Sequence, residues 1–221
     1  NRKTAEAGKE LAEASLRSVE TQASLGMATE NDVLTAREAV KTAEAGVISA
    51  ESNIQSVKQN LQVMTGWAYN SEPEIAQMPP VDVTRIDAMN PETDLEKALE
   101  NNYTLLIAKR TLENTSDAAN QQIQRQTIAN TEQQIASGLT DLYSQVLQAR
   151  NTYDQARSAL ELEEKNMAAA ETKYGLGMIS RLEYLQARNA YVESQANFRI
   201  QELALQSATD AYDWALRGNM V

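Results

Sequence analysis

Two long stretches of the chain place apolar side chains at alternating spacings of three and four residues. In residues 30–65, position a of each heptad carries large residues, which are Val33, Val40, Val47, Ile54 and Leu61. Position d carries mostly alanine there, with Ala36, Ala43, Ala50, Val57 and Met64. In residues 142–174, position a carries Val146, Tyr153, Leu160, Met167 and Tyr174, and position d carries Leu142, Ala149, Ala156, Glu163 and Ala170.

This heptad period predicts α-helices that wind around a neighbour as a left-handed coiled coil. Alanine at d lets two helix axes approach closely, and a parallel leucine zipper is disfavoured because leucine occupies d only at Leu142. Antiparallel helix hairpins are therefore favoured. Glu163 interrupts the second seam, so it either fixes the register of the helices or faces a water-filled space.

Glycine and proline divide the chain into helical stretches. Helices are predicted over 5–24, 30–65 and 181–216, and a proline-free helical stretch covers 92–174. Glycines end the stretches at Gly26, Gly66 and Gly177. Most prolines lie in 67–90, where residues 81–86 alternate between apolar and polar in the manner of one short strand. The predicted fold class is all-α, with long antiparallel coiled-coil hairpins and a small irregular segment that holds this strand.

The chain contains an internal repeat at an offset of 151 residues. The shift lays Leu25-Gly26-Met27 on Leu176-Gly177-Met178, and the agreement is densest at this turn between two helices. The predicted organisation is a helical hairpin of the first repeat at 1–66, an irregular connecting segment at 67–92, and the second repeat at 93–221, with its hairpin tip near 175–180. Residue 1 corresponds to about residue 152, so the first repeat is expected to be incomplete at its N-terminus.

Both turns carry the residues of a tight helix–turn–helix. Gly26 and Gly177 stand where a helix ends and a left-handed residue is favoured. Thr29 and Ser180 are predicted N-caps. Three residues further on, capping boxes are completed by Asp32 and Glu183.

Two interpretations of these turns stay open. In the first, the residues only build the connection between helices. In the second, the turns form an exposed recognition tip, which consists of Gly26, Met27, Thr29, Gly177, Met178 and Ser180. The two methionines favour the tip, because an apolar side chain is unexpected at a solvated apex and a flexible thioether suits a contact surface.

The composition excludes several kinds of chemistry. The 221 residues include no Cys and no His, which rules out disulfides, thiolate nucleophiles, Cys/His zinc sites and His-based triads. The net charge of -11 argues against nucleic acid as a partner and against docking on an anionic membrane. No stretch reaches the roughly 20 apolar residues of a membrane-spanning helix. No nucleophile–base pair or metal cluster stands out, so neither an enzyme nor a cofactor or metal site is expected.

The second turn and its flanks resemble the helical tip motif of TolC-type outer-membrane efflux channels. The resemblance lies in Tyr174-Gly175-Leu176-Gly177-Met178-Ile179-Ser180 and in the following Glu183-Tyr184-Leu185-Gln186-Ala187-Arg188. Residues 25–37 are similar to the tip of the family's first repeat, 62–66 to the end of its first hairpin, and 98–110 to the start of its second repeat. The resemblance covers nearly the whole chain in the family's order.

The resemblance implies a homotrimer in which two repeats per chain build a twelve-helix tunnel, and tips that meet the adaptor protein of a tripartite pump. It places Glu183 at the family's first acidic gate position and Gln186 where some members carry a second acid. Together with Glu163, these are the candidates for gate and lumen residues. The implied location is the cell envelope, at the outer membrane or periplasm.

The largest departure from the family is the lack of barrel strands. The family inserts two strands between the opening helix of each repeat and its long descending helix. Residues 112–141 contain no alternating run of the required roughly 9–11 residues. The chain is instead expected to reverse within 113–137. It would then be either a barrel-deleted segment or a barrel-less relative, and not itself membrane-spanning.

Two functional hypotheses follow. The first is the helical part of a TolC-like efflux or secretion channel, which conducts substrates passively through a tunnel and whose acidity belongs to the lumen. The alternative is a structural coiled-coil scaffold or interaction module with no role in transport.

Overall fold

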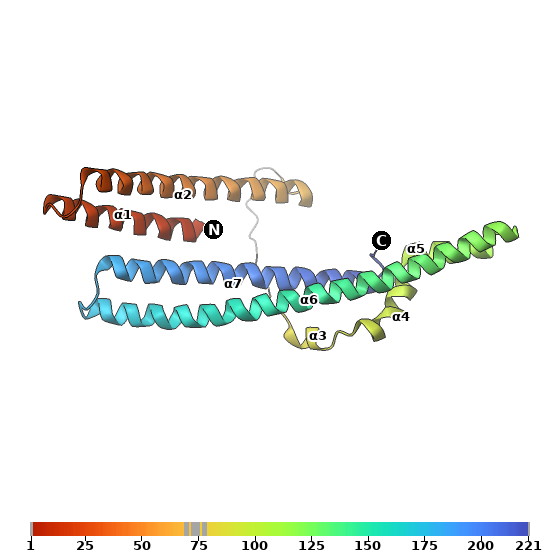
Figure 1. The fold of residues 1–221 in the computed structure, drawn as a ribbon. Helices are drawn as coiled ribbons and strands as arrows, with labels where there is room; N and C mark the ends of the chain where they lie inside the picture. Colours follow the sequence, from red (N-terminus) through yellow and green to blue (C-terminus); the bar gives the residue numbers. More distant parts are fainter. Residues whose placement is uncertain (1, 69–70, 72–75, 77–78, 221) are drawn as a thin grey trace. The chain divides into compact units, whose positions relative to one another are not determined.

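The computed structural model describes residues 2–68, 71, 76 and 79–220, and every regular element among them is an α-helix (Figure 1). The helices are α1 (Arg2–Ser24), α2 (Glu30–Thr65), α3 (Val83–Asp87), α4 (Pro91–Asn101), α5 (Tyr103–Glu113), α6 (Ala118–Gly175) and α7 (Arg181–Leu216). The all-α prediction is therefore confirmed for the described residues. Part of the connecting segment predicted at 67–92, namely 69–70, 72–75 and 77–78, lies outside them.

The chain forms two compact units. Unit 1 consists of Asn1–Met78 and Ala156–Arg199, and unit 2 consists of Pro79–Gln155 and Ile200–Val221. The long helices α6 and α7 contribute to both units, so each unit is described by itself.

In unit 1, α1 and α2 pack against each other (Figure 1). Within 31–50 the only residues of α2 that are not exposed are 33, 36, 40, 43, 47 and 50, which are positions a and d of the sequence pattern. The later seam residues Ile54, Val57 and Met64 are exposed. The apolar pattern of α2 therefore extends further along the helix than the face it buries against α1.

Two arginines connect α1 to α7 within unit 1. The Glu10 carboxylate accepts a hydrogen bond from the Arg188 guanidinium at 2.7 Å and lies 3.6 Å from that of Arg181. In the part of α6 that belongs to this unit, residues 156, 160, 163, 167 and 170 are the only ones of 156–170 that are not exposed. Glu163 thus lies in the same inward row as its apolar neighbours.

The helices that follow the two turns have equal lengths. Both α2 and α7 contain 36 residues. Their first residues, Glu30 and Arg181, and their last residues, Thr65 and Leu216, are each 151 positions apart.

The core of unit 2 combines side chains from α3 to α7. Its most completely buried members include Ile86, Leu105, Leu139, Leu205 and Tyr212. The Tyr212 hydroxyl donates to the Asp94 carboxylate at 2.8 Å, and burial raises the pKa of this phenol above its usual value. Helices as short as α3, α4 and α5 are marginal alone, so this core is what stabilises them.

The strand predicted over 81–86 is wrong, because residues 83–86 lie in α3. The Asp82 carboxylate caps this helix and accepts hydrogen bonds from the backbone N–H of Thr84 at 3.0 Å and of Arg85 at 3.3 Å. A hydrogen bond from the Thr84 hydroxyl is the main cause that lowers the pKa of Asp82. Over so few residues the apolar alternation also fits one helical turn with Ile86 on its buried side, and the N-cap favours the helix.

The chain reverses in residues 114–117, between α5 and α6, inside the range expected from the sequence. Lys109 of α5 forms an ion pair at 3.2 Å with Glu132 of α6. A second break was not predicted. Asn102 ends α4 with an extended backbone, ψ 115°, and begins α5 by accepting the Leu105 N–H at 2.9 Å.

The C-terminal residues fold back onto this α4–α5 junction. The side-chain amides of Asn101 and Asn102 donate to the carbonyl oxygens of Leu216 at 2.8 Å and Met220 at 2.7 Å. Gly218, with φ 88°, passes so close that a Cβ built on it would lie 2.0 Å from the Asn101 carbonyl oxygen. Only glycine fits this position.

Candidate functional site

The first candidate site is the turn between α1 and α2, residues 25–29 of unit 1. The Gly26 N–H donates to the Ala23 carbonyl at 3.0 Å, and the Met27 N–H donates to the Gln22 carbonyl at 2.8 Å. Gly26 is left-handed, with φ 74°. This is the Schellman arrangement, in which a glycine past the helix end satisfies the last free carbonyls.

The turn between α6 and α7, residues 176–180, forms the same bonds 151 residues later. The Gly177 N–H donates to the Tyr174 carbonyl at 2.9 Å, and the Met178 N–H donates to the Lys173 carbonyl at 2.8 Å. Gly177 is also left-handed, with φ 69°. The predicted left-handed glycine is confirmed in both turns.

Both predicted capping boxes are also present. The Thr29 N–H donates to the Asp32 carboxylate at 2.8 Å, and the Asp32 N–H donates to the Thr29 hydroxyl at 3.2 Å. The Ser180 and Glu183 pair forms the same two bonds, at 2.8 Å and 3.2 Å. The Thr29 and Ser180 hydroxyls also donate to these carboxylates, at 2.7 Å and 2.8 Å. The bonds that the carboxylates accept lower the pKa of both carboxyls, chiefly through the Thr29 hydroxyl for Asp32 and through the Ser180 N–H for Glu183. Each carboxylate thus stays charged at a helix N-terminus, where the helix dipole favours it.

Each turn presents one leucine and one methionine to solvent. The exposed fractions are 66% for Leu25 and 68% for Met27, and 71% for Leu176 and 69% for Met178. An apolar residue after the left-handed glycine often packs on the last helical turn of a Schellman motif, but here about two thirds of each leucine and methionine stays exposed and is available to a partner.

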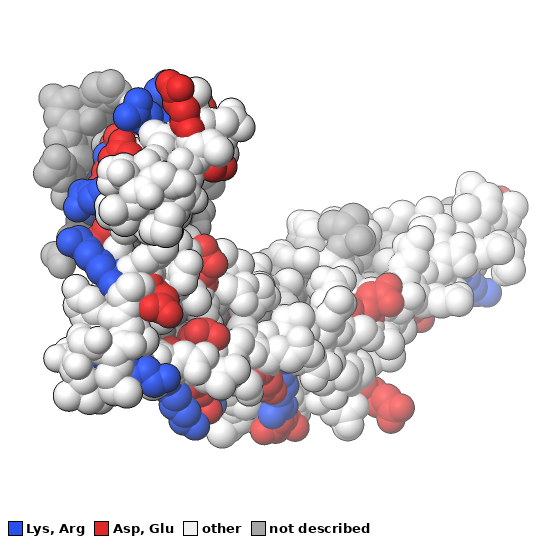
Figure 2. All heavy atoms as spheres, turned by 60° about the vertical axis from the view of Figure 1, so that its left-hand side comes forward, with Lys and Arg blue, Asp and Glu red and all other residues white. Residues whose placement is uncertain are grey.

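The two turns lie at one end of unit 1 (Figure 1). On the face shown in Figure 2, basic and acidic side chains are interspersed, and neither sign forms a continuous patch. The exposed apolar turns are therefore the candidate contact site, and the face in Figure 2 offers no charged patch beside them.

The candidate gate and lumen residues Glu163, Glu183 and Gln186 differ in exposure and in their hydrogen-bond partners. Glu183 is exposed but holds its carboxylate in the capping box, and Gln186 is exposed on the next turn of α7. Glu163 is half-buried and accepts a hydrogen bond from Asn166 at 3.3 Å. It precedes the end of α6 by twelve residues, which places it about 18 Å from the turn along the helix.

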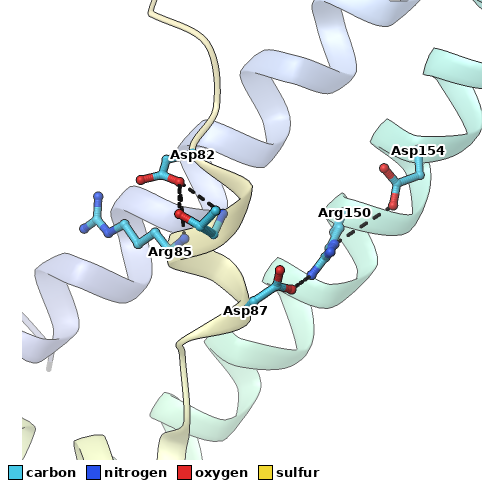
Figure 3. A network of polar contacts seen from close by, with 6 residues as sticks. Asp82, Arg85, Asp87, Arg150 and Asp154 are labelled. Atoms are coloured by element: carbon cyan, nitrogen blue, oxygen red, sulfur yellow. Dashed lines mark hydrogen bonds and ion pairs between the residues drawn. The ribbon is translucent and has the colours of Figure 1, made fainter.

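A second polar cluster, in unit 2, anchors α3 (Figure 3). Arg85 forms an ion pair with Asp213 of α7. Asp87 forms one with Arg150 of α6, which is also 4.0 Å from Asp154. The hydrogen bond to Asp87 is the main cause that raises the pKa of Arg150. Arg85 and Asp87 thus attach α3 to α7 and α6 through ion pairs, and this structural role accounts for the cluster. Sequence reasoning did not find it, because its partners lie 63 and 128 positions apart.

An aromatic pair behind the second turn was also not predicted. The rings of Tyr174 and Tyr184 stack with their centroids 4.8 Å apart. The available signal was a tyrosine three residues before the left-handed glycine and another four residues after the N-cap.

The described residues contain no group of three or more acidic side chains placed to hold a metal ion. In the same part of the chain, no helix combines the length and the hydropathy needed to cross a bilayer. No protein-family model matches the sequence, and no curated protein is significantly similar to it. The geometry of the turns is therefore the basis for a functional proposal.

Proposed function

We propose that this chain is the helical tunnel part of a TolC-like efflux or secretion channel. It docks through its two turns onto the adaptor protein of a tripartite pump and conducts substrates passively. The observation that carries the proposal is the duplicated turn, with the same hydrogen bonds, the same left-handed glycine and the same exposed leucine and methionine at two places in the chain.

The physical properties of the turns support a docking role. Burial of a leucine or methionine side chain against a partner contributes about 1.5–3 kcal/mol. The Schellman bonds and capping boxes hold the backbone fixed, which reduces the conformational entropy lost on binding. Methionine side chains on such a frame can still adapt to the partner surface.

In the proposed assembly, the internal repeat supplies antiparallel coiled-coil hairpins, and three chains surround one tunnel. The equal lengths of α2 and α7 at an offset of 151 residues support the repeat. Glu163, Glu183 and Gln186 are the proposed lumen and gate residues. The net charge of -11 would concentrate cations at the entrance. The proposed location is the cell envelope, at the outer membrane or periplasm.

The variant Gly177→Asp tests the docking role. A Cβ built at this glycine meets no atom within 4 Å, so aspartate adds a charge at the apex without a clash of its Cβ and with only the strain of a left-handed backbone. Gly66→Asp is the matched control, because Gly66 has φ 70° against 69° and equally open surroundings but closes the far end of α2. We expect Gly177→Asp to lose chemical crosslinking to the purified adaptor while Gly66→Asp retains it, with equal helicity by circular dichroism. Equal crosslinking of the two variants would refute docking through the turns.

The alternative, a coiled-coil scaffold or interaction module, differs in assembly. Light scattering and native mass spectrometry over a range of concentrations distinguish the two. Closed trimers would favour the channel, and a dimer that persists at every concentration would favour the scaffold.

A further inference from the structure

The second turn has a connection between its helices that the first turn lacks. The Tyr174 and Tyr184 rings stack with centroids 4.8 Å apart and planes inclined by 20°. The Tyr174 carbonyl accepts the Gly177 N–H, and the Tyr184 N–H donates to the Ser180 carbonyl at 3.1 Å. The two rings therefore join the last turn of α6 to the first turn of α7, directly behind the apex.

The equivalent residues of the first turn are Ala23 and Val33. Their backbone bonds are the same, with the Gly26 N–H on the Ala23 carbonyl at 3.0 Å and the Val33 N–H on the Thr29 carbonyl at 3.3 Å. Neither side chain has a ring that can stack. The helices of the first turn are joined instead by an exposed ion pair one helical turn further back, Arg37 to Glu20 at 3.2 Å, and such pairs contribute little in water. The two turns thus share one backbone arrangement and differ in the side chains that connect their helices.

We propose that Tyr174 and Tyr184 are positioning residues that make the second turn the more rigid one, and hence the turn that determines affinity for the adaptor. The proposal rests on the docking function proposed above. An aromatic pair in this geometry favours the closed arrangement by a factor of about two to ten. A turn already held in its bound conformation loses less conformational freedom on docking, whereas the first turn can adjust to the partner.

The test gives the second turn the residues of the first, in the double variant Tyr174→Ala/Tyr184→Val. The first readout is hydrogen exchange of the Met178 amide, with the Met27 amide of the same molecule as reference, since both donate to equivalent carbonyls at 2.8 Å. We expect exchange at Met178 to become about two to ten times faster while exchange at Met27 stays unchanged. The second readout is affinity for the purified adaptor, which should fall by a similar factor.

The matched control is Tyr174→Phe/Tyr184→Phe, which keeps both rings and should keep both wild-type values. Tyr184→Leu retains apolar bulk without an aromatic face and should behave like the Ala/Val variant. Unchanged exchange at Met178 in the Ala/Val variant would overturn the stiffening role. Faster exchange with unchanged affinity would overturn the role in docking. If Gly177→Asp also keeps its crosslinking, the docking function itself fails, and the exchange measurement still decides whether the stack holds the turn.

Discussion

Gly218 is the position where a single added methyl group should destabilise unit 2 most. With φ 88°, it places a built Cβ 2.0 Å from the carbonyl oxygen of Asn101 and 2.5 Å from its carbonyl carbon. Both contacts are with backbone atoms, so no side-chain rotation relieves them. In Gly218→Ala the C-terminal residues must therefore move away from the α4–α5 junction.

The cost of this movement has three parts. The left-handed conformation costs an alanine about 1 kcal/mol. The hydrogen bonds from Asn101 to Leu216 and from Asn102 to Met220 would be lost. The bond from Asn101 contributes about 1 kcal/mol. Because Asn102 is only 1% exposed, the loss of its bond leaves a buried amide without a partner, which costs about 1–3 kcal/mol. We expect the free energy of unfolding of unit 2 to fall by about 3–5 kcal/mol.

Urea unfolding followed by tryptophan fluorescence measures this effect. In a Trp67→Phe background, the fluorescence of Trp214 follows unfolding near Gly218. In a Trp214→Phe background, the fluorescence of Trp67 follows unfolding near Gly66. Gly66→Ala is the control, because Gly66 is equally left-handed, with φ 70°, and a Cβ there meets no atom within 4 Å. It should lose only about 1 kcal/mol. Equal losses in the two variants would refute the reasoning, since the approach to Asn101 would then not be what requires glycine.

Three further results are expected. Ser180→Ala removes the N-cap of α7 and should cost about 1 kcal/mol, measured as faster hydrogen exchange in the first turn of α7. The control Ser207→Ala, at an exposed position within the same helix, should leave that exchange unchanged. Equal effects of the two variants would contradict the capping role of Ser180. Because the capping box lowers the pKa of Glu183, protection of this turn should be complete above about pH 4.5 and lost as the pH falls through the lowered pKa. Glu183→Gln should abolish that dependence, and its persistence would assign it to another group. Ile86→Ala empties a buried site and should lower the free energy of unfolding by about 2–5 kcal/mol in urea. Arg85→Ala removes a partly exposed ion pair and should lower it by less than about 1 kcal/mol. The reverse order would mean that the ion pair, and not the burial of Ile86, holds α3 in place.

The features that the sequence predicted correctly depend on neighbouring residues. A left-handed glycine after a helix and a Ser or Thr three residues before an acid each have a local physical cause, so Gly177 and Ser180 could be assigned without knowledge of the fold. The ends of α2 and α7 follow from the same signals. The exposure of Met27 and Met178 was likewise expected, because both lie between two helix ends.

The features that were missed depend on distant residues. Residues 81–86 have an ambiguous pattern, and the core that receives Ile86 comes from helices far along the chain. The break at Asn102 has no glycine or proline, and its amide finds its acceptor at Met220, 118 positions away. The ion pairs of α3 likewise need the folded arrangement before their partners are known. The Tyr174–Tyr184 stack is different, because its residues flank a turn that the sequence predicted and it could have been found from that turn.

The identical backbone of the two turns has a consequence for how they can change. Residues 25–29 and 176–180 can replace each other, because both segments lie between the same Schellman hydrogen bonds and the same capping box. Both also need a left-handed glycine and an N-cap residue. Because Leu-Gly-Met is common to both, an exchange of these five residues would swap only Ala28 with Ile179 and Thr29 with Ser180, and it would leave Tyr174 and Tyr184 in their helices. The surface of a turn and its stiffness are thus encoded in separate parts of the chain, and either can vary without rebuilding the other.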